Sequence, residues 1–294
     1  MVAGEEEKEG EGEEPEGEEQ QQSDKEEGEG EGKEAKVVAR ADRRYQRHER
    51  ENRFLDRKSE DYQVVEEVFD MPTMMVITKM INDGVLKSVQ SHFASGKEAK
   101  VFIAEAPDGS PLAVKIYLTV SAEFKKRMQY MAGDPRFSEL KGGTRNLITA
   151  WARKEFKNLQ QAHKAGVRAP APVAVDRNVL VMEFIGDSEG NVAVPLANLE
   201  SVTAADYEEV VEQLKILYQK AGLVHADLSE YNIFKNPDGE ITLLDFGSAV
   251  DTKHPNSKQF LVRDLQNINR FFIKRGIDVI DTTHLMDKIM KTTG

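Results

Sequence analysis

Hydrophobic and polar residues alternate along the middle of the chain in patterns that predict β-strands. Strands are expected at 88–93, 101–106, 112–118, 171–175 and 179–185, with an Asp108-Gly109 hairpin turn between the second and the third. In the third strand, Leu112, Val114 and Ile116 share one face, so Lys115 projects from the other. The pattern predicts a five-stranded antiparallel sheet with a lysine on an inner face, where it needs an anionic partner.

Apolar residues spaced three and four apart predict helices around these strands. One helix is expected at 147–165, ending at Gly166, with Glu155 on its apolar face. Further helices are expected at 204–221, with Thr203 as N-cap, at 257–275 and at 282–291, and two short amphipathic segments lie within 62–88. The polar residues 119–147 and the segment 186–199 are expected to be loops. An inward-facing Glu155 requires a cation, and Lys115 is the candidate.

The stretch 223–247 combines short apolar runs with polar side chains that a plain hairpin does not need. Asp227 and Asn232 are five residues apart, and Asp245 of an Asp-Phe-Gly sequence follows eighteen residues after Asp227. This is the spacing of a kinase catalytic loop and its metal-binding turn. Phosphoryl transfer needs a carboxylate near the attacking hydroxyl, and an amide oxygen and a second carboxylate to hold magnesium. The sequence therefore predicts an ATP-dependent phosphotransferase that uses Mg²⁺.

Neighbouring residues are interpreted as supports for this stretch. His225 is expected to be structural, because Asp227 already fills the place of the catalytic carboxylate. Asp264 falls on the inward face of the 257–275 helix and is expected to hydrogen-bond the backbone of the catalytic loop. Only 49 residues follow Asp245, and they contain no Ala-Pro-Glu sequence and no long activation segment. We therefore expect a catalytic centre without the usual peptide-binding platform.

Charge is distributed unevenly along the chain. Residues 1–36 contain sixteen acidic residues and four lysines, whereas the remainder has 36 of each sign, so the net charge of −12 belongs to the tail. Its Glu-Gly-Gln composition cannot offset the entropy of ordering, and we expect it to be disordered. The arginine-rich residues 37–60 are expected to form a helix, which either lies on nucleic acid phosphates or is simply solvated.

Composition also excludes several kinds of protein. The absence of cysteine excludes disulfides, thiolate zinc sites and cysteine nucleophiles. No apolar run approaches the roughly 20 residues of a membrane span, and the acidic N-terminus is unlike a signal peptide. We expect a soluble cytoplasmic protein with no membrane partner.

Several motifs together resemble the RIO family of atypical serine kinases. They are Ser-Gly-Lys-Glu-Ala at 95–99, Ala-Val-Lys-Ile-Tyr at 113–117, Val-Met-Glu-Phe-Ile-Gly at 181–186, His-Ala-Asp-Leu-Ser-Glu-Tyr-Asn at 225–232, and His-Pro-Asn with Phe-Leu-x-Arg-Asp at 254–264. The resemblance covers about residues 62–280, and the insertion at 134–137 is similar to that of the type-1 branch in its archaeal form. It implies a bilobal protein-kinase-like α+β fold. Residues 88–186 would form the N-lobe, 187–294 a reduced helical C-lobe, and 37–87 the basic helix and a small helical subdomain.

The resemblance also implies which residues bind the nucleotide. Lys115 would bind the phosphates with Glu155 as its partner, and the backbone of Glu183 and Ile185 would hold adenine. The phosphate-covering residues would be Ser95, Gly96 and Lys97. This loop departs from the family pattern, because Ala94 stands where a hydroxyl residue is usual and Ser95 must supply that contact alone.

Roles in the transfer step follow from the same resemblance. Asp227 would be the catalytic acceptor, and Asn232 and Asp245 would bind magnesium. Family members are thought to form an acyl phosphate on the aspartate that corresponds to Asp245. The sequence Asp245-Phe246-Gly247-Ser248 is a second departure, because relatives often carry a different residue after the aspartate.

The function implied is serine phosphorylation or ATP hydrolysis during maturation of the small ribosomal subunit. The implied partner is the precursor of this subunit, through its proteins, with its rRNA as a further candidate. One alternative is a nucleotide-gated binding factor with little kinase activity. Another is a small-molecule kinase of the aminoglycoside or choline type, although 49 residues after Asp245 are few for its substrate lobe. Ser138 and Thr144 are candidate self-phosphorylation sites. The sequence leaves the physiological substrate and the oligomeric state open.

Overall fold

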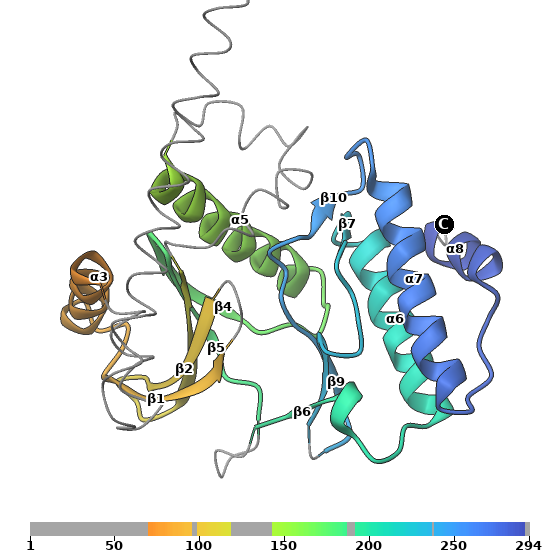
Figure 1. Cartoon of the computed structure of the whole chain (residues 1–294), viewed down its shortest axis with the longest axis horizontal. Helices are drawn as coiled ribbons and strands as arrows, with labels where there is room; N and C mark the ends of the chain where they lie inside the picture. The colour runs from red at the N-terminus through yellow and green to blue at the C-terminus, as the bar shows by residue number, and fades with distance from the viewer. Residues whose placement is uncertain (1–69, 96–98, 119–142, 187–191, 237, 292–294) are drawn as a thin grey trace, which may run out of the picture. The chain divides into compact units, whose positions relative to one another are not determined.

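The structure is a computed structural model that describes residues 70–95, 99–118, 143–186, 192–236 and 238–291, with the backbone alone for 91–95. The chain divides into two compact units, Met1–Glu60 and Asp61–Gly294, and every described residue lies in the second. Within this unit, a sheet flanked by helices precedes a mostly helical part (Figure 1). The expected acidic tail, the basic helix and the first amphipathic segment of 62–88 lie outside the described residues.

The N-terminal sheet has five antiparallel strands, as predicted. They are β1 (Ser88–Ser95), β2 (Ala99–Glu105), β3 (Pro111–Tyr117), β4 (Pro172–Asp176) and β5 (Val179–Glu183), in the spatial order β1-β2-β3-β5-β4. β3 is the central strand, and Lys115 is paired with Val101 of β2 and Leu180 of β5. A central strand has no free edge, so the backbone around Lys115 is held from both sides.

Alternation along β3 assigns the two faces of the sheet to two hydrophobic cores. Leu112, Val114 and Ile116 pack in the core that contains the inner face of helix α3 (Met71–Asn82). Ala113 and Tyr117 belong to the larger core, which contains helix α5 (Thr144–Lys164). The two helices lie on opposite sides of the sheet (Figure 1). Lys115 therefore projects to the α5 side, as the alternation predicted.

Helix α3 corresponds to the second amphipathic segment predicted within 62–88. Asp70 caps it by accepting a hydrogen bond from the Thr73 N–H at 2.9 Å. Gly84, with φ of 73°, ends it in a conformation that glycine adopts without strain.

Helix α5 begins at Thr144, three residues earlier than the sequence predicted. The residues of its first turn, 144–146, are polar and exposed, so they add no apolar periodicity that would reveal a helix. The predicted loop 119–147 is thus too long at its C-terminal end, and its residues 119–142 lie outside the described part of the chain.

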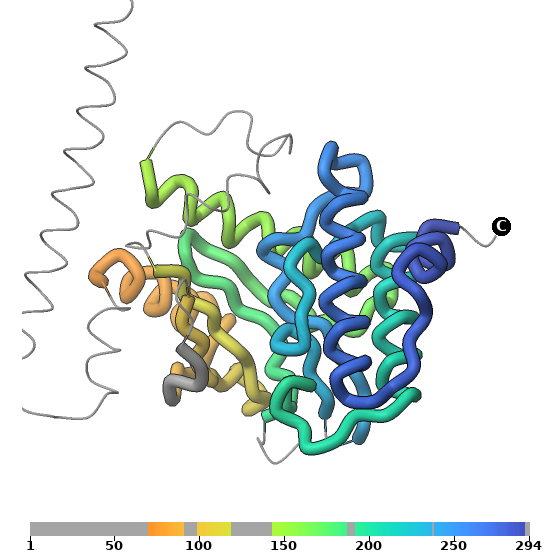
Figure 2. Tube along the Cα trace, turned by 45° about the vertical axis from the view of Figure 1, so that its right-hand side comes forward, coloured from red at the N-terminus to blue at the C-terminus, as the bar shows by residue number. Residues whose placement is uncertain are grey.

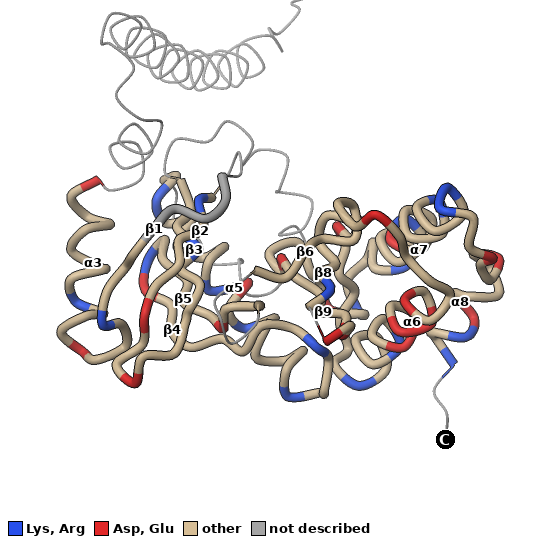
Figure 3. Tube along the Cα trace, turned by 90° about the horizontal axis from the view of Figure 1, so that it is seen from below, with Lys and Arg blue, Asp and Glu red and all other residues tan. Residues whose placement is uncertain are grey.

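The C-terminal part contains helices α6 (Ala204–Gln219), α7 (Ser257–Lys274) and α8 (Thr282–Met290), close to their predicted positions. Thr203 and Asp206 form a capping box that fixes the start of α6. Residues of both charge signs are distributed over these helices (Figure 3), as the balanced charge outside the tail predicts.

Short strands lie between these helices and the N-terminal sheet in Figures 1 and 2. β7 (Leu223–Val224) pairs with β10 (Val250–Asp251), and β6 (Val194–Pro195), β8 (Ile233–Lys235) and β9 (Ile241–Leu243) form a second small sheet. β6 and the 3-10 helix η3 (Leu196–Asn198) fall where the sequence predicted only a loop. A two-residue strand is too short to produce a recognisable alternation. None of the helices in the described residues is long and apolar enough to cross a membrane.

Candidate active site

Lys115 of the central strand brings three predicted site residues together. Its Nζ donates to both carboxylate oxygens of Glu155 on α5, at 2.9 and 3.0 Å, and to Oδ1 of Asp245 at 3.0 Å. Lys115 and Glu155 are buried, whereas the side chain of Asp245 is 45% exposed. The predicted pairing of Lys115 with Glu155 is confirmed, and Asp245 joins the pair through the same ammonium group.

Burial and charge compete at this cluster. Burial lowers the pKa of Lys115, but the carboxylates of Asp245 and Glu155 outweigh it and hold that pKa above its usual range. Burial also raises the pKa of Glu155 to about 7, with the charge of Asp245 acting in the same direction and that of Lys115 against it. Lys115 is thus held in its charged form on the α5 side of the sheet, between two acidic side chains.

The backbone of the loop that carries Asp227 is held by side chains of α7. The carboxylate of Asp264 accepts hydrogen bonds from the N–H of Ala226 at 2.7 Å and of Leu228 at 3.0 Å, so its predicted support role is confirmed. Burial raises the pKa of Asp264 to about 7, against these hydrogen bonds and the charge of Arg263. The side chain of Asp227 itself lies at an exposed position. The loop therefore presents this carboxylate to solvent while its backbone is held.

Two further residues of α7 hold the same loop and were missed in the sequence analysis. Arg263 donates to the carbonyl of Ala226, and Asn267 donates to the carbonyl of Leu228 at 3.1 Å. The signal available was their position, because Arg263 is adjacent to Asp264 and Asn267 is one helical turn after it.

Asn232 closes the other end of the catalytic loop. Its Nδ2 donates to the carbonyl of Asp227 at 2.9 Å, a bond that leaves the amide oxygen for another partner. The backbone carbonyl of Asn232 accepts a hydrogen bond from the Leu244 N–H, also at 2.9 Å, which connects Asn232 to the residue before Asp245. One side-chain and one backbone hydrogen bond of Asn232 therefore connect the backbone of Asp227 to that of Leu244, next to Asp245.

The Asp-Phe-Gly turn has an unusual backbone conformation. Asp245 has φ of 63° and Ala226 has φ of 66°, values that cost a non-glycine residue on the order of 1 kcal/mol or more and persist only where surrounding contacts impose them. At this turn, His225 Nε2 contacts the Leu244 carbonyl at 2.9 Å, and its ring lies 5.1 Å from the Phe246 ring. Burial lowers the pKa of His225. A neutral, buried imidazole matches its predicted structural role.

Residues predicted to hold adenine lie where the sheet connects to the C-terminal part. The Glu183 N–H donates to the Ala171 carbonyl at 2.8 Å, and its carboxylate accepts from the Ala171 N–H at 3.0 Å. The Ile185 carbonyl accepts from the Ala193 N–H at 3.0 Å. These bonds order the connection, and the carbonyl of Glu183 and the N–H of Ile185 take no part in them.

The predicted phosphate-covering loop is only partly described. Ser95 is the last residue of β1, and its backbone pairs with Lys100 of β2. Gly96 and Lys97 lie outside the described residues. β1 extends two residues beyond the predicted strand 88–93, and β2 begins two residues before the predicted strand 101–106, so the connection between them is shorter than predicted.

The donor atoms of Asp245 and Asn232 fit magnesium better than a transition metal. Both offer oxygen, and Mg²⁺ in phosphoryl-transfer sites takes one or two carboxylates together with substrate phosphates. Among the described residues, no group of three or more His, Cys, Asp or Glu side chains could hold a metal ion without such help. A metal at this position would therefore depend on the nucleotide.

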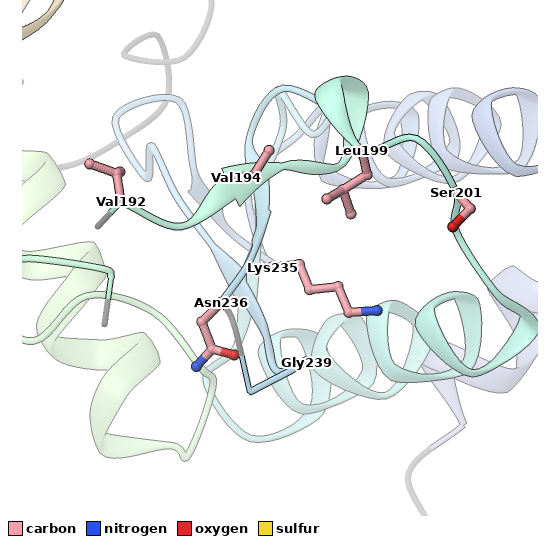
Figure 4. A pocket seen from close by; sticks show the side chains of 7 residues that line it. All are labelled: Val192, Val194, Leu199, Ser201, Lys235, Asn236 and Gly239. Atoms are coloured by element: carbon pink, nitrogen blue, oxygen red, sulfur yellow. The ribbon is translucent and has the colours of Figure 1, made fainter. Parts of the chain in front are cut away.

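A separate cavity of about 290 Å³ lies beside the small sheet and contains none of these residues (Figure 4). It is lined by Val192, Val194, Leu199, Ser201, Lys235, Asn236 and Gly239. Lys235 is already paired with Asp206 at 2.7 Å. We assign this cavity no role in the chemistry of the site.

A two-part fold with this lysine, glutamate and aspartate arrangement is of the protein-kinase-like class. The RIO domain family model matches residues 100–285. RIO-type serine/threonine-protein kinase Rio1 of Haloferax volcanii is 39% identical over 244 residues, covering 83% of this chain and 82% of the relative. The Rio1 kinase of Methanocaldococcus jannaschii is 37% identical over 243 residues, covering 81% of this chain and 80% of the relative. The chain belongs to the RIO family of serine/threonine-protein kinases and falls on its Rio1 branch.

Solved structures support the fold. The chain is similar to the Rio2 kinase of Chaetomium thermophilum, crystallised as an ADP/Mg²⁺-phosphoaspartate complex, with a TM-score of 0.57 and 24% identity. The similarity covers 74% of this chain and 66% of the Rio2 chain. At this identity, the likeness concerns the fold.

Proposed function

We propose that this kinase binds ATP and magnesium between its N-terminal sheet and its helical C-terminal part, and transfers the γ-phosphoryl group to a serine hydroxyl. The observation that carries the proposal is the contact of Lys115 with both Glu155 and Asp245, beside a loop that holds Asp227 and Asn232. This pattern combines a cation for phosphates, oxygen ligands for magnesium and an exposed carboxylate for the acceptor.

Each residue would act on a different part of the nucleotide. Lys115 would bind phosphate oxygens while Glu155 fixes its ammonium group, and the Glu183 carbonyl and Ile185 N–H would bind the adenine edge. Ser95, Gly96 and Lys97 would cover the phosphates. Asn232 and Asp245 would hold Mg²⁺, which when bound neutralises charge on the phosphates.

Asp227 would orient the acceptor hydroxyl and accept its proton as the new phosphorus–oxygen bond forms and the bond to the ADP leaving group breaks. The backbone hydrogen bonds from Asp264, Arg263 and Asn267 support this role, because they hold the loop through its main chain and leave the Asp227 carboxylate at the surface. The Rio2 kinase of similar fold was crystallised with a phosphoaspartate. On that likeness we propose that Asp245 can also receive the phosphoryl group and pass it to water, which gives ATP hydrolysis.

The proposed setting is cytoplasmic maturation of the small ribosomal subunit, with a precursor particle as the partner. The short segment after Asp245 supports a macromolecular partner of this kind: β10 begins at Val250 and α7 at Ser257, so no long activation segment lies between Asp245 and α7. Generic peptides should then be poor acceptors, and turnover should rise when a specific partner completes the site.

The test compares transfer of labelled γ-phosphate in three samples: the protein with generic peptides, the protein alone, and the protein with small-subunit precursor particles. We expect slow hydrolysis or self-phosphorylation alone, little peptide labelling, and faster turnover with particles. Rapid peptide labelling without any response to particles would contradict the proposed partner. Particle binding that depends on ATP, with no transfer, would favour a nucleotide-gated binding factor.

A further inference from the structure

Helix α5 is bound to the segment that follows Asp245 by two side chains that the catalytic scheme does not use. Lys154 Nζ donates to the carbonyls of Gly247 and Ala249, each at 2.6 Å. Asn158 Nδ2 donates to the carbonyls of Phe246 and Ala249, each at 2.9 Å. Four hydrogen bonds from one helix thus converge on three carbonyls within four residues of chain.

Two more contacts join the same elements. A Cβ atom built on Gly247 would lie 2.9 Å from Nε1 and 3.3 Å from Cε2 of Trp151, so the turn approaches this ring as closely as a glycine allows. The backbone of Phe246 also lies close enough to the Glu155 carboxylate to act against the raised pKa of that group. Trp151, Lys154, Glu155 and Asn158 follow the i, i+3, i+4, i+7 spacing of one helical face.

The burial of Lys154 shows that this contact is costly to build. Lys154 is 1% exposed and Asn158 is fully buried. Moving an ammonium group out of water carries a large desolvation penalty, which only well-placed acceptors offset. Apolar side chains could pack a helix against a turn without that penalty. Apolar packing is not directional, whereas hydrogen bonds to particular carbonyl groups fix the position of the turn along the helix.

We propose that Lys154 and Asn158 are positioning residues that latch the Asp-Phe-Gly turn to α5, so that Glu155 and Asp245 keep a fixed spacing on either side of Lys115. This rests on the proposed magnesium role of Asp245. The latch would set the position of the Asp245 carboxylate before nucleotide arrives. Neither latch residue would contact ATP or the metal.

The latch explains how the chain manages without a long activation segment. In ordinary protein kinases, the ion pair of the strand lysine with the helix glutamate and the placement of the Asp-Phe-Gly aspartate are controlled together by activation-loop phosphorylation. Here β10 begins at Val250, five residues after Asp245, and α7 follows at Ser257. The two elements are joined inside the fold by buried hydrogen bonds.

The experiment compares the full-length Lys154→Met and Asn158→Leu variants with wild type and with Lys157→Met, a control at an exposed position of the same helix. Binding of ATP is measured by calorimetry with and without Mg²⁺, and hydrogen exchange is followed in the peptide covering 245–251. Each latch variant should raise the Mg²⁺ concentration for half-maximal ATP binding by about tenfold or more, the usual effect of removing a group that orients a metal ligand. Affinity for ATP without Mg²⁺ should change by less than about threefold, since Lys115 and the adenine-binding backbone remain.

Hydrogen exchange separates a local latch from a general packing effect. In the latch variants, exchange should accelerate in 245–251 while α6 and α8 keep wild-type protection. The Lys157→Met control should match wild type in both measurements. The latch is refuted if folded Lys154→Met and Asn158→Leu proteins keep the wild-type Mg²⁺ dependence, or if exchange rises equally throughout the molecule. Should Lys154→Met fail to fold, Asn158→Leu decides alone. A wild-type protein whose ATP binding ignores Mg²⁺ would instead refute the proposed metal site.

Discussion

Single side chains at the site divide into those that would meet the nucleotide and those that hold them in place. Asp227 is exposed and Asp245 is 45% exposed, whereas Asp264 has no exposed surface. Ligands can reach the exposed carboxylates, and the buried one is committed to backbone N–H groups. Substitutions in the two groups should therefore have different consequences, one on ligand binding or transfer and the other on stability.

Asp227 and Asp245 should separate binding from transfer. Asp227→Ala should still bind ATP with Mg²⁺, but its rate of phosphoryl transfer should fall by about 100-fold or more, because the variant lacks only the base that accepts the proton of the acceptor hydroxyl. Asp245→Ala should lose Mg²⁺-dependent binding as well as turnover. Calorimetry with nucleotide and a turnover assay test both, with the exposed Asp278→Asn as a control. Loss of ATP binding in a folded Asp227→Ala protein would contradict the assigned roles.

The buried Asp264 predicts a pH dependence of stability. Its pKa is about 7 in the folded protein and roughly 4 when unfolded, so the folded state holds the proton more tightly between these values. This stabilising contribution is complete below about pH 4 and is lost as the pH rises to about 7, at up to about 1.4 kcal/mol per pH unit.

Asp264→Asn removes that contribution and also one of the two backbone acceptors. The stability of wild type relative to the variant should fall as the pH rises from about 4.5 to about 7.5, because only the wild type releases this proton. Urea unfolding at intervals across this range measures it, and the raised pKa of Glu155 cancels because both proteins share it. A difference that stays constant with pH would show that Asp264 does not titrate in this window.

At the scale of elements, the site depends on a strand and a helix that lie far apart in the sequence. Lys115 and Glu155 are 40 residues apart, and Lys115 and Asp245 are 130 apart. β3 fixes the lysine because it is paired on both sides, and α5 fixes the glutamate because its neighbouring positions are buried in the core. The three groups act as a unit only while these elements keep their spacing.

Lys115→Met and Glu155→Gln should therefore have non-additive effects. Each should reduce turnover strongly, and the double variant should be little worse than the poorer single one, because either change already breaks the same pair. Turnover of the four proteins at saturating and limiting ATP completes the cycle. If the two losses simply multiplied, the pair would not work as one unit.

At the scale of the whole molecule, the net charge lies outside the part of the chain that the structure describes. The tail 1–36 carries the net charge, and every described residue belongs to the unit Asp61–Gly294. Removing 1–36 should leave the melting temperature and intrinsic ATP turnover unchanged, because a Glu-Gly segment has few apolar groups to contribute to a core. Thermal unfolding and turnover of the truncated protein test this, and an unfolded product would show that the tail is part of the folded unit.

Residues 37–60 should instead matter for nucleic acid. Deleting them together with the tail should weaken binding to RNA, and the loss should be larger at low salt, because arginine contacts with phosphates release counterions. RNA titrations at two salt concentrations compare this protein with the 1–36 deletion. Equal affinity of the two proteins would favour the simpler interpretation of 37–60 as a solvated helix.

The sequence by itself determined the longer helices and strands and indicated the candidate reacting groups. Alternation along β3 placed Lys115 on the face opposite Leu112, Val114 and Ile116, and helical spacing turned Glu155 and Asp264 inward. The spacing of Asp227, Asn232 and Asp245 indicated phosphoryl transfer. These are local properties, because strand and helix periods depend only on neighbouring residues. The start of α5 was placed three residues late for the same reason, since a polar, exposed first turn has no apolar period.

Apart from the predicted contacts of Lys115 with Glu155 and of Asp264 with the catalytic loop, only the tertiary structure decided which distant groups meet. In the sequence, nothing distinguishes Lys154 from the other lysines of its helix. Its buried contacts are with Gly247 and Ala249, which are 93 and 95 positions further along the chain. The Lys115 contact with Asp245, like the hold of Arg263 and Asn267 on the catalytic loop, is also non-local. Such contacts depend on how whole elements pack, and packing is set by the shape of the complete core, which no local pattern contains.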